Sequence, residues 1–377
     1  MNTVFQIIGS LGDGGAETLV KDYALLLDKS KFKVIVITIY PPTSETANVK
    51  ILRESNIPIV SLYKKHSLAN RILRRYTMKL LDSFKLNKLV SQYKPSVIHV
   101  HQAYLYALKP IRKKLRHIKL MYTCHSLPVN FLGPNISKEN NAAKCLIRDN
   151  NLQMIALHND MKQEIDTMFG INNTIVINNG IDFKKYNKLT FEQERFLRKE
   201  INLSKEDFVV GHIGRFSKAK NHTFLIEVFN EILKRKPNSK LLLIGAGPLE
   251  NEIKCQINQL NIKENVRLLN HRTDVNQLLR LMNVFLFPSL YEGFGIVLVE
   301  AQVSDLRCVV SDKVNPIAIA SPNTISVSLT KSASEWADIV LNDKITNSRY
   351  TNLNVFNLRK IIKIVERIYQ DESFNPV

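Results

Sequence analysis

The residues of this chain that could do chemistry gather in three glycine-containing loops, at residues 9–17, 214–222 and 289–301. Glycines let a backbone approach a phosphate, and a helix that follows such a loop offers free N–H groups at its N-terminus. In the second loop, Arg215 and Lys220 add a guanidinium fork and a point charge, which together suit a diphosphate. Taken alone, this loop is better explained by two solvated cations.

Two carboxylates, Glu292 and Glu300, mark the third loop and the helix expected after it. Gly293 and Gly295 open this helix, and Glu300 lies about two turns further on, since eight residues span roughly 12 Å of helix. Carboxylates at the two ends could hold two hydroxyl-bearing parts of one ligand, a sugar and a ribose. Because Glu300 follows the apolar run IVLV, leaving it unpaired would be costly, which favours a functional role.

The first loop and the histidines give weaker signals. Residues 9–17 lack the G-x-G-x-x-G spacing, and the second expected strand does not end on an acid that could hold a ribose. A dinucleotide-binding fold is therefore disfavoured, and a tight turn explains the glycines equally well. His125 follows an expected strand, and by itself it fits a core histidine better than a functional one.

Elements that could position these loops alternate along the whole chain. Short apolar runs typical of buried parallel strands occur at residues 4–9, 33–40, 96–101, 119–125, 154–158, 208–214, 240–247, 266–269, 284–289 and 308–312. Helical patterns separate them, which predicts an α/β protein with two doubly wound, Rossmann-like domains. Ligands bind beyond the carboxyl ends of such strands, so the expected site is a cleft across which the domains face each other.

The domain boundary is expected in the polar stretch 182–207, which has no strand pattern. We predict an N-terminal domain at residues 1–185 and a C-terminal domain at residues 186–377. The last helix, about residues 355–377, could pack back on the N-terminal domain.

Composition excludes several other classes of protein. The chain has 377 residues, 45% of them hydrophobic, and its four cysteines are far apart. This pattern does not support a disulfide framework or a zinc ribbon and fits reduced, intracellular thiols. The N-terminus lacks a signal-peptide pattern and no window of 18 uncharged apolar residues occurs, so we expect neither export by that route nor a membrane span.

The net charge of +19 is concentrated in residues 64–119, which hold 15 basic residues and one acid, Asp82. Residues 67–93 fit a basic amphipathic helix, which favours contact with an anionic membrane surface over a merely solvated face. The expected membrane-surface residues are Arg71, Arg74, Arg75, Lys79, Lys113 and Lys114. Nucleic-acid binding is the alternative, but the chain has no zinc finger, RNA-binding motif or recognisable helix-turn-helix.

Taken together and in this order, the loops resemble glycosyltransferase family 4, a group of retaining enzymes that use nucleotide sugars and have the GT-B fold. The resemblance rests on GGAE at residues 14–17, NNGID at 178–182, GRFSKAKNH at 214–222, LLLIGAGPLE at 241–250 and FPSLYEGFGIVLVEAQ at 287–302. The last contains the family's E-x7-E signature. The chain looks most like bacterial capsule and exopolysaccharide glycosyltransferases, which also tend to carry an SxxEWAD stretch like residues 332–338.

The resemblance implies a role for each matched residue. Arg215 and Lys220 would bind the donor diphosphate and stabilise the leaving nucleotide. Glu300 would bind the ribose and Glu292 would face the donor sugar, while His125 would contact that sugar and support turnover. Further expected donor-binding residues are Gly15, Gly214, Phe294, Gly295 and Ile296. His101 is a weaker candidate for a supporting role, and His158 is assigned none.

The resulting expectation is a retaining transferase that moves a hexosyl-type sugar from a nucleotide sugar, with a UDP-sugar as the expected donor, to a lipid-linked glycan during bacterial surface polysaccharide synthesis. It would work in the cytoplasm on the inner face of the plasma membrane, with no nucleic-acid partner. The leaving phosphate would help to deprotonate the acceptor, so no protein nucleophile is nominated. The chain has no D-x-D for a metal, and we expect no metal and no cofactor.

Two alternatives share the fold: a nucleotide-sugar epimerase or hydrolase, and a partner subunit without catalytic activity. The second is raised by Asp305 and Arg307, which stand where the family usually has glycine and proline. If that glycine needs a positive φ, aspartate tolerates the conformation better than most residues do, at some cost in stability.

Overall fold

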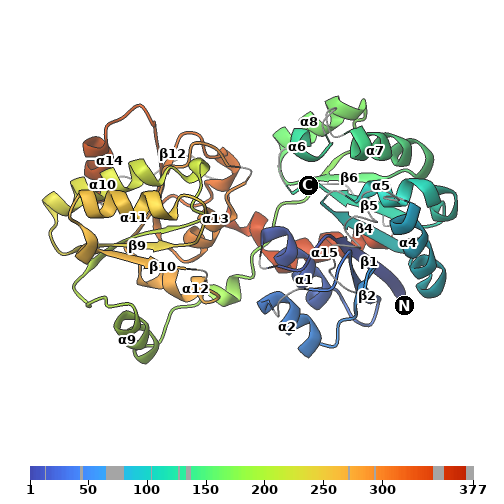
Figure 1. Ribbon diagram of the computed structural model, residues 1–377, viewed down its shortest axis with the longest axis horizontal. Helices are drawn as coiled ribbons and strands as arrows, with labels where there is room; N and C mark the ends of the chain where they lie inside the picture. Colours follow the sequence, from blue (N-terminus) through green and yellow to red (C-terminus); the bar gives the residue numbers. More distant parts are fainter. Residues whose placement is uncertain are drawn as a thin grey trace. The chain divides into compact units, whose positions relative to one another are not determined.

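The computed structural model describes residues 1–12, 14–42, 46–64, 80–102, 104–125, 128–132, 137–270, 272–292, 294–342 and 352–370. The chain divides into two compact units. Unit 1 combines Met1–Gly180 with Leu358–Val377, and unit 2 is Ile181–Asn357 (Figure 1). Each unit is a parallel sheet covered by helices on both faces, as the alternation of strand and helix patterns predicts.

Unit 1 is built on a seven-stranded parallel sheet with the order β3-β2-β1-β4-β5-β6-β7. Its strands are β1 (Asn2–Ile8), β2 (Phe32–Thr38), β3 (Ile59–Ser61), β4 (Val97–His101), β5 (Lys119–Thr123), β6 (Gln153–Ala156) and β7 (Ile175–Val176). The helices α1 (Gly15–Leu26), α2 (Ala47–Glu54) and α15 (Leu358–Tyr369) contribute to the core on one face of the sheet. The other face carries α4 (Leu80–Tyr93), α5 (Leu105–Leu108), the 3₁₀ helix η1 (Lys109–Leu115), α6 (Pro128–Leu132), α7 (Ser137–Asn150) and α8 (Asn159–Phe169).

Unit 2 is built on a six-stranded parallel sheet with the order β10-β9-β8-β11-β12-β13. Its strands are β8 (Phe208–Ile213), β9 (Ser239–Ile244), β10 (Val266–Leu269), β11 (Val284–Phe287), β12 (Arg307–Ser311) and β13 (Thr324–Val327). One face packs on α10 (His222–Arg235), α11 (Glu250–Gln259) and α14 (Ala333–Leu341). The other packs on α12 (Val275–Leu278) and α13 (Ile296–Val303), and Leu197 of α9 (Phe191–Glu200) joins the same core.

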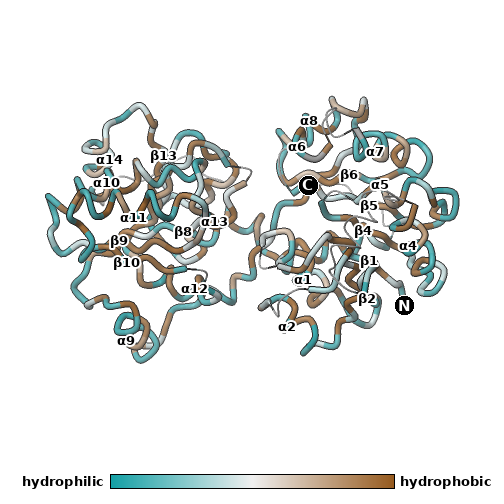
Figure 2. The backbone as a smooth tube through the Cα atoms, viewed as in Figure 1, coloured by the Kyte–Doolittle hydropathy of each residue, from teal (hydrophilic) through white to brown (hydrophobic). Residues whose placement is uncertain are grey.

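The strands of both sheets are apolar along their length because helices cover both of their faces. Figure 2 shows strands such as β9 and β10 in the brown of hydrophobic residues, with teal concentrated in surrounding loops and helix faces. In β11, every residue of Val284–Phe287 is buried, and β1 buries its last five residues. The ten strands expected from the sequence are all present.

Three short strands at sheet edges, β3, β7 and β13, were missed by the sequence prediction. The polar stretch 182–207 contains helix α9. It belongs to unit 2, where Thr190 and Gln193 form a capping box at the start of α9 and Leu197, Ile201 and Leu203 enter the core. Helix α15 belongs to unit 1, so the chain passes from one unit to the other twice.

The basic helix expected at residues 67–93 is described only from Leu80 onward, as α4; Arg71, Arg74, Arg75 and Lys79 lie outside the described residues. Leu86 and Val90 of α4 pack into the core of unit 1, while Phe84 is exposed. Asp82 is buried and accepts hydrogen bonds from the hydroxyls of Tyr63 and Tyr106, at 2.6 and 2.7 Å. Within the described part of the chain, no helix is long and apolar enough to cross a membrane.

Candidate active site

The loop that carries Arg215 and Lys220 is held by close backbone contacts at the end of β8. The loop after β9 supplies two glycines for which a side chain would leave no room. A Cβ on Gly245 would lie 2.0 Å from the carbonyl oxygen of Gly214, and one on Gly247 would lie 2.4 Å from that of Phe216. The amide of Phe216 donates to the Ala246 carbonyl at 3.0 Å. The GAG sequence thus fixes the backbone on both sides of Arg215.

Lys220 and Glu292 form an ion pair that links the second and third loops of the sequence. The Lys220 Nζ lies 2.6 Å from Glu292 Oε1, and the side chains are only 15% and 9% exposed. The Leu290 amide also donates to the Ala219 carbonyl at 2.8 Å, which ties the two loops together through their backbones. Lys220 further lies over the Phe287 ring, 4.7 Å from its centroid. Arg215, by contrast, is exposed.

Helix α13 begins at the third loop. Its N-cap is Gly295, whose φ of 79° is left-handed and favours glycine. Phe294 before it is buried against Phe356, with ring centroids 5.5 Å apart, and Ile296 is the first residue of the helix. The free N–H groups of this N-terminus suit an anion.

Glu300 lies in α13, one turn before the end of the helix. Burial raises the pKa of its carboxyl to about 7, while a hydrogen bond with Tyr186 and the charge of Lys185 act in the opposite direction. Tyr186 is the last residue of the 3₁₀ helix η2 (Phe183–Tyr186), which directly follows the NNGID motif. Sequence reasoning missed Tyr186; its position just after NNGID was the available signal.

Unit 1 contains the other two predicted site residues, Gly15 and His125. Gly15 is the first residue of α1, and a Cβ on it would meet nothing within 4 Å, so ligand atoms could approach its backbone. His125 follows β5, and its Nε2 lies 2.8 Å from Nδ1 of His101. Burial lowers the pKa of His125 to about 4, which keeps the imidazole neutral near pH 7.

The structure therefore brings some predicted residues together and leaves others separate. Lys220 pairs with Glu292, and Gly214 lies beside Lys220, since a Cβ on Gly214 would come within 3.1 Å of Lys220 Cε. In unit 1, Lys113 and Lys114 are exposed on η1. Among the described residues, no group of three or more His, Cys, Asp or Glu side chains could hold a metal ion. Metal-independent action stays a prediction.

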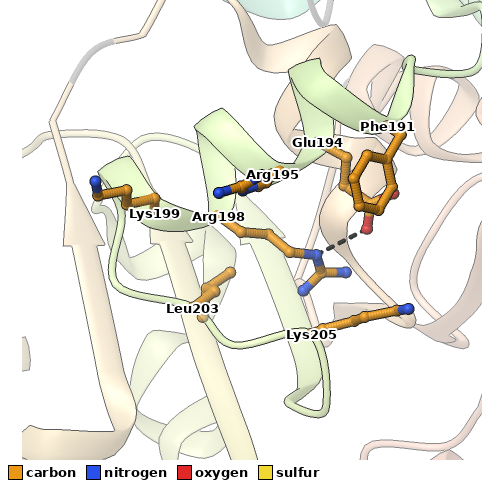
Figure 3. A pocket seen from close by; sticks show the side chains of 7 residues that line it. All are labelled: Phe191, Glu194, Arg195, Arg198, Lys199, Leu203 and Lys205. Carbon is orange, nitrogen blue, oxygen red and sulfur yellow. Dashed lines mark hydrogen bonds and ion pairs between the residues drawn. The ribbon is translucent and has the colours of Figure 1, made fainter.

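A pocket of about 450 Å³ lies beside α9, apart from these residues (Figure 3). Its lining is Phe191, Glu194, Arg195, Arg198, Lys199, Leu203 and Lys205. Arg198 is already held there by Glu194 at 2.8 Å and by the Ser204 carbonyl at 3.0 Å. None of the predicted site residues lines this pocket.

Two features singled out in the sequence have structural roles. Ser332 and Glu335 of the SxxEWAD stretch form the capping box of α14, and the indole of Trp336 donates to the Ser328 carbonyl at 3.1 Å. His158, which was assigned no role, is the N-cap of α8, where its Nδ1 accepts from the Met161 amide at 3.2 Å.

Comparison with known proteins agrees with this geometry. Residues 13–185 match the family described as Glycosyltransferase Family 4, and residues 193–341 match Glycosyl transferases group 1. The chain is 28% identical over 323 residues to the UDP-Gal:alpha-D-GlcNAc-diphosphoundecaprenol alpha-1,3-galactosyltransferase of Escherichia coli, covering 79% of this chain and 80% of that protein. It is 32% identical over 166 residues to the capsular polysaccharide biosynthesis glycosyltransferase CapM of Staphylococcus aureus, covering 42% and 43%.

Among solved structures, Anabaena Alr3699/HepE in complex with UDP-glucose superimposes with a TM-score of 0.76 at 20% identity, over 98% of this chain and 100% of that one. This likeness shows the fold, which is GT-B. The chain therefore belongs to the glycosyltransferases, as an enzyme built from a family 4 domain followed by a group 1 domain.

Proposed function

We propose that this enzyme is a retaining glycosyltransferase that moves a hexosyl-type sugar from a UDP-sugar to a lipid-linked glycan in bacterial surface polysaccharide synthesis. The observation that carries the proposal is the Lys220–Glu292 pair beside the N-terminus of α13, with Glu300 further along that helix. The names of the E. coli and S. aureus relatives, which specify a diphosphoundecaprenol acceptor and capsule synthesis, support the acceptor class.

The chemistry follows from the charges of these groups. As the glycosidic C–O bond of the donor breaks, negative charge accumulates on the departing diphosphate. Lys220, Arg215 and the amides at the start of α13 are suited to stabilise that charge. Glu292 would face the donor sugar, and Glu300 would accept hydrogen bonds from the ribose hydroxyls. The acceptor hydroxyl attacks the same face of the sugar, and its proton passes to the leaving phosphate.

The ion pair between Lys220 and Glu292, at 2.6 Å, joins two groups that a donor would also engage. A donor diphosphate would give Lys220 a second anionic partner, so Glu292 becomes available to a sugar hydroxyl only as the diphosphate binds. This exchange would couple occupation of the phosphate site to placement of the sugar.

The decisive assay supplies radiolabelled UDP-sugars to the purified full-length chain, with and without a membrane extract that contains lipid-linked glycans. A transferase moves label into the lipid fraction only when the extract is present. Equal consumption of donor without the extract would instead identify the epimerase or hydrolase alternative. Failure to bind UDP in a calorimetric titration would favour the partner subunit without activity.

We also propose that unit 1 contacts an anionic membrane surface through its basic segment. The supporting observation is the exposure of Lys113 and Lys114 on η1, within the stretch 64–119 that holds 15 basic residues and one acid. Because each basic residue near such a surface contributes about 1 kcal/mol, Lys113→Glu/Lys114→Glu should weaken binding to phosphatidylserine vesicles, measured by flotation, by at least about 30-fold. Lys234→Glu/Lys254→Glu, on exposed lysines of unit 2, is the charge-matched control, and equal loss in both variants would contradict the proposal.

A further inference from the structure

A chain of buried hydrogen bonds runs from His125 through the sheet of unit 1 to the C-terminal helix. Its members come from four elements that are far apart in sequence: β1, β4, β5 and α15. From His125, the first hydrogen bond joins its Nε2 to His101 Nδ1 at 2.8 Å, and the second joins His101 Nε2 to Gln6 Oε1 at 2.7 Å. Gln6 Nε2 then donates to the Tyr369 hydroxyl at 2.8 Å. That hydroxyl lies 2.7 Å from His99 Nδ1, and His99 Nε2 lies 2.7 Å from the Thr123 hydroxyl.

The imidazoles in this chain of hydrogen bonds are neutral because burial disfavours their charged forms. Gln6, His99 and His101 have no exposed surface. Burial lowers the pKa of His101 well below its usual value, that of His99 to about 3 and that of His125 to about 4. A neutral imidazole has one donor and one acceptor nitrogen, so each link dictates the direction of the next.

The side-chain amide of Gln6 sets the donor and acceptor of every hydrogen bond toward His125, because its nitrogen can only donate and its oxygen can only accept. Its Nε2 donates to Tyr369, so its Oε1 must accept from Nε2–H of His101. His101 then has only an acceptor at Nδ1, and His125 must donate to it from Nε2–H. It follows that Nδ1 of His125 carries a lone pair. If the Gln6 amide were turned over, every one of these bonds would reverse and His125 Nδ1 would carry the proton.

The hydroxyl of Tyr369 decides which of the two orientations of the Gln6 amide is favoured. Without its hydroxyl, the present orientation leaves both N–H groups of the Gln6 amide without an acceptor in a fully buried place. The reversed orientation keeps one N–H bonded to His101 and leaves a carbonyl oxygen unpaired instead. Orphaned buried N–H groups are rarer than under-satisfied carbonyls, so loss of the hydroxyl should favour the reversed direction.

We propose that Gln6, His101 and Tyr369 are positioning residues that hold His125 in the Nε2–H form, so that its Nδ1 accepts a hydrogen bond from a hydroxyl of a bound sugar. This inference rests on the role in sugar binding that the family resemblance implies for His125. Its consequence is that α15, which follows unit 2 in the sequence but belongs to unit 1, helps to set the protonation of a histidine 244 positions before Tyr369.

The test measures which nitrogen of His125 carries the proton. Full-length protein with ¹⁵N-labelled histidine is examined near pH 7.5 by long-range ¹H–¹⁵N correlation, with the His125 signals assigned by their loss in His125→Gln. The wild type should show Nε2–H, and Tyr369→Phe should show a population with Nδ1–H. The phenylalanine keeps the ring that packs edge-on against Phe32, at a centroid distance of 5.9 Å. Tyr93→Phe is the matched control, since Tyr93 packs on Phe5 at 6.0 Å and is not part of the chain of hydrogen bonds.

Each outcome has a defined meaning. An Nδ1–H signal in the wild type would overturn the proposed direction, and an unchanged Nε2–H signal in Tyr369→Phe would overturn the role of Tyr369. A shift of the same size in Tyr93→Phe would also count against it. If Tyr369→Phe does not fold, Gln6→Met removes the link from the other side and should give the same mixture.

Activity provides the second readout. With the fold retained, Tyr369→Phe should lower kcat/KM for the sugar donor by about tenfold, by analogy with the loss of residues that orient metal-binding histidines. If the wild type transfers sugar but the His125 signals do not change in Tyr369→Phe, the inference is wrong while the proposed function stands. If no donor supports transfer, the proposed function fails, and the spectra still decide the direction of the hydrogen bonds.

Discussion

Lys220 and Glu292 form an ion pair that joins two loops of the candidate site. The two residues are far apart in sequence, yet their atoms lie 2.6 Å apart with little exposure of either side chain. A buried pair of this kind stabilises a protein only weakly compared with a well-packed apolar pair, because both charges lose water. Because the pair adds little stability, its place between the loop after β8 and the loop before α13 fits a role in binding an anion.

Replacement of Lys220 by methionine is expected to lower kcat/KM about 100-fold to 1,000-fold, because one charge that stabilises the leaving diphosphate is lost. The rate of sugar transfer measures this effect. Lys218→Met, on an exposed lysine of the same 3₁₀ helix η3 (Lys218–Lys220), is the control and should retain wild-type rates. Because Lys220→Met leaves Glu292 unpaired, Lys220→Met/Glu292→Gln separates loss of activity from loss of stability. Near wild-type transfer by Lys220→Met would refute the assignment.

The raised pKa of Glu300 predicts how stability depends on pH. Its pKa is about 7 in the folded protein, above the value of about 4.3 expected in the unfolded chain. Between these two values the folded state binds more protons than the unfolded state, so this group's contribution to stability is present below about pH 4 and is lost as pH rises through 7. Glu300→Gln removes the effect. Its free energy of unfolding relative to wild type should therefore rise by about 2–3 kcal/mol between pH 5 and pH 8.

Urea denaturation followed at both pH values tests this expectation. Glu252→Gln, on an exposed carboxylate of α11, serves as the control. A difference between Glu300→Gln and wild type that does not change with pH would show that the carboxyl of Glu300 titrates normally.

At the scale of single elements, the backbone at the end of α13 shows how an aspartate, Asp305, fits a position where the family usually has glycine. The amide of Asp305 donates to the Gln302 carbonyl at 2.9 Å, and that of Leu306 donates to the Ala301 carbonyl at 3.1 Å. These two bonds form a Schellman motif, in which the residue after the helix takes a left-handed conformation. Asp305 does so, with a φ of 58°. The position usually held by glycine in the family is thus kept by an aspartate that adopts the same backbone conformation.

Asp305→Gly should stabilise unit 2 by about 1 kcal/mol, since glycine adopts this conformation without the steric cost of a Cβ. Asp305→Asn removes the same charge but tolerates the left-handed region much as aspartate does, so it is expected to stay within about 0.5 kcal/mol of wild type. Chemical denaturation of the three proteins provides the comparison. A gain of equal size in both variants would attribute the effect to charge rather than to the backbone.

Short edge strands are the elements that the sequence did not predict. β7 has two residues and β3 has three, too few to show the run of apolar residues that marks a buried parallel strand. β13, Thr324–Val327, has the mixed composition TISV and, among the described strands, lies at the edge of its sheet next to β12. The central strands were predicted because helices cover both of their faces, which requires continuous apolar runs.

At the scale of the whole molecule, the order of segments along the chain differs from their grouping into the two units. Helix α15 follows unit 2 in sequence, yet Leu358, Ile361 and Val365 belong to a core of unit 1 together with residues of β1, α1 and α2. Unit 1 is therefore incomplete until the end of the chain has been made. Its stability should depend on a helix that a division by sequence alone would give to the other domain.

Ile361→Asp is expected to destabilise unit 1 by about 3–5 kcal/mol, because it places a carboxylate at a position that is 3% exposed. Lys360→Asp introduces an aspartate at the exposed neighbouring position and is the matched control. Hydrogen exchange resolved by peptide should show faster exchange in β1 and β4 and unchanged exchange in β8 and β9. Equal destabilisation of both units would mean that they do not unfold separately.

The sequence by itself determined the strand-and-helix alternation, the three glycine-containing loops and the residue types in them, because these depend on local apolar runs, turn residues and charge. The tertiary structure alone decided which side chains meet. The pairing of Lys220 with Glu292, the hydrogen bond between Tyr186 and Glu300, and the link from His125 to Tyr369 all join residues far apart in sequence. Such contacts arise from strand order in the two sheets and from the return of α15, neither of which leaves a periodic pattern in the chain.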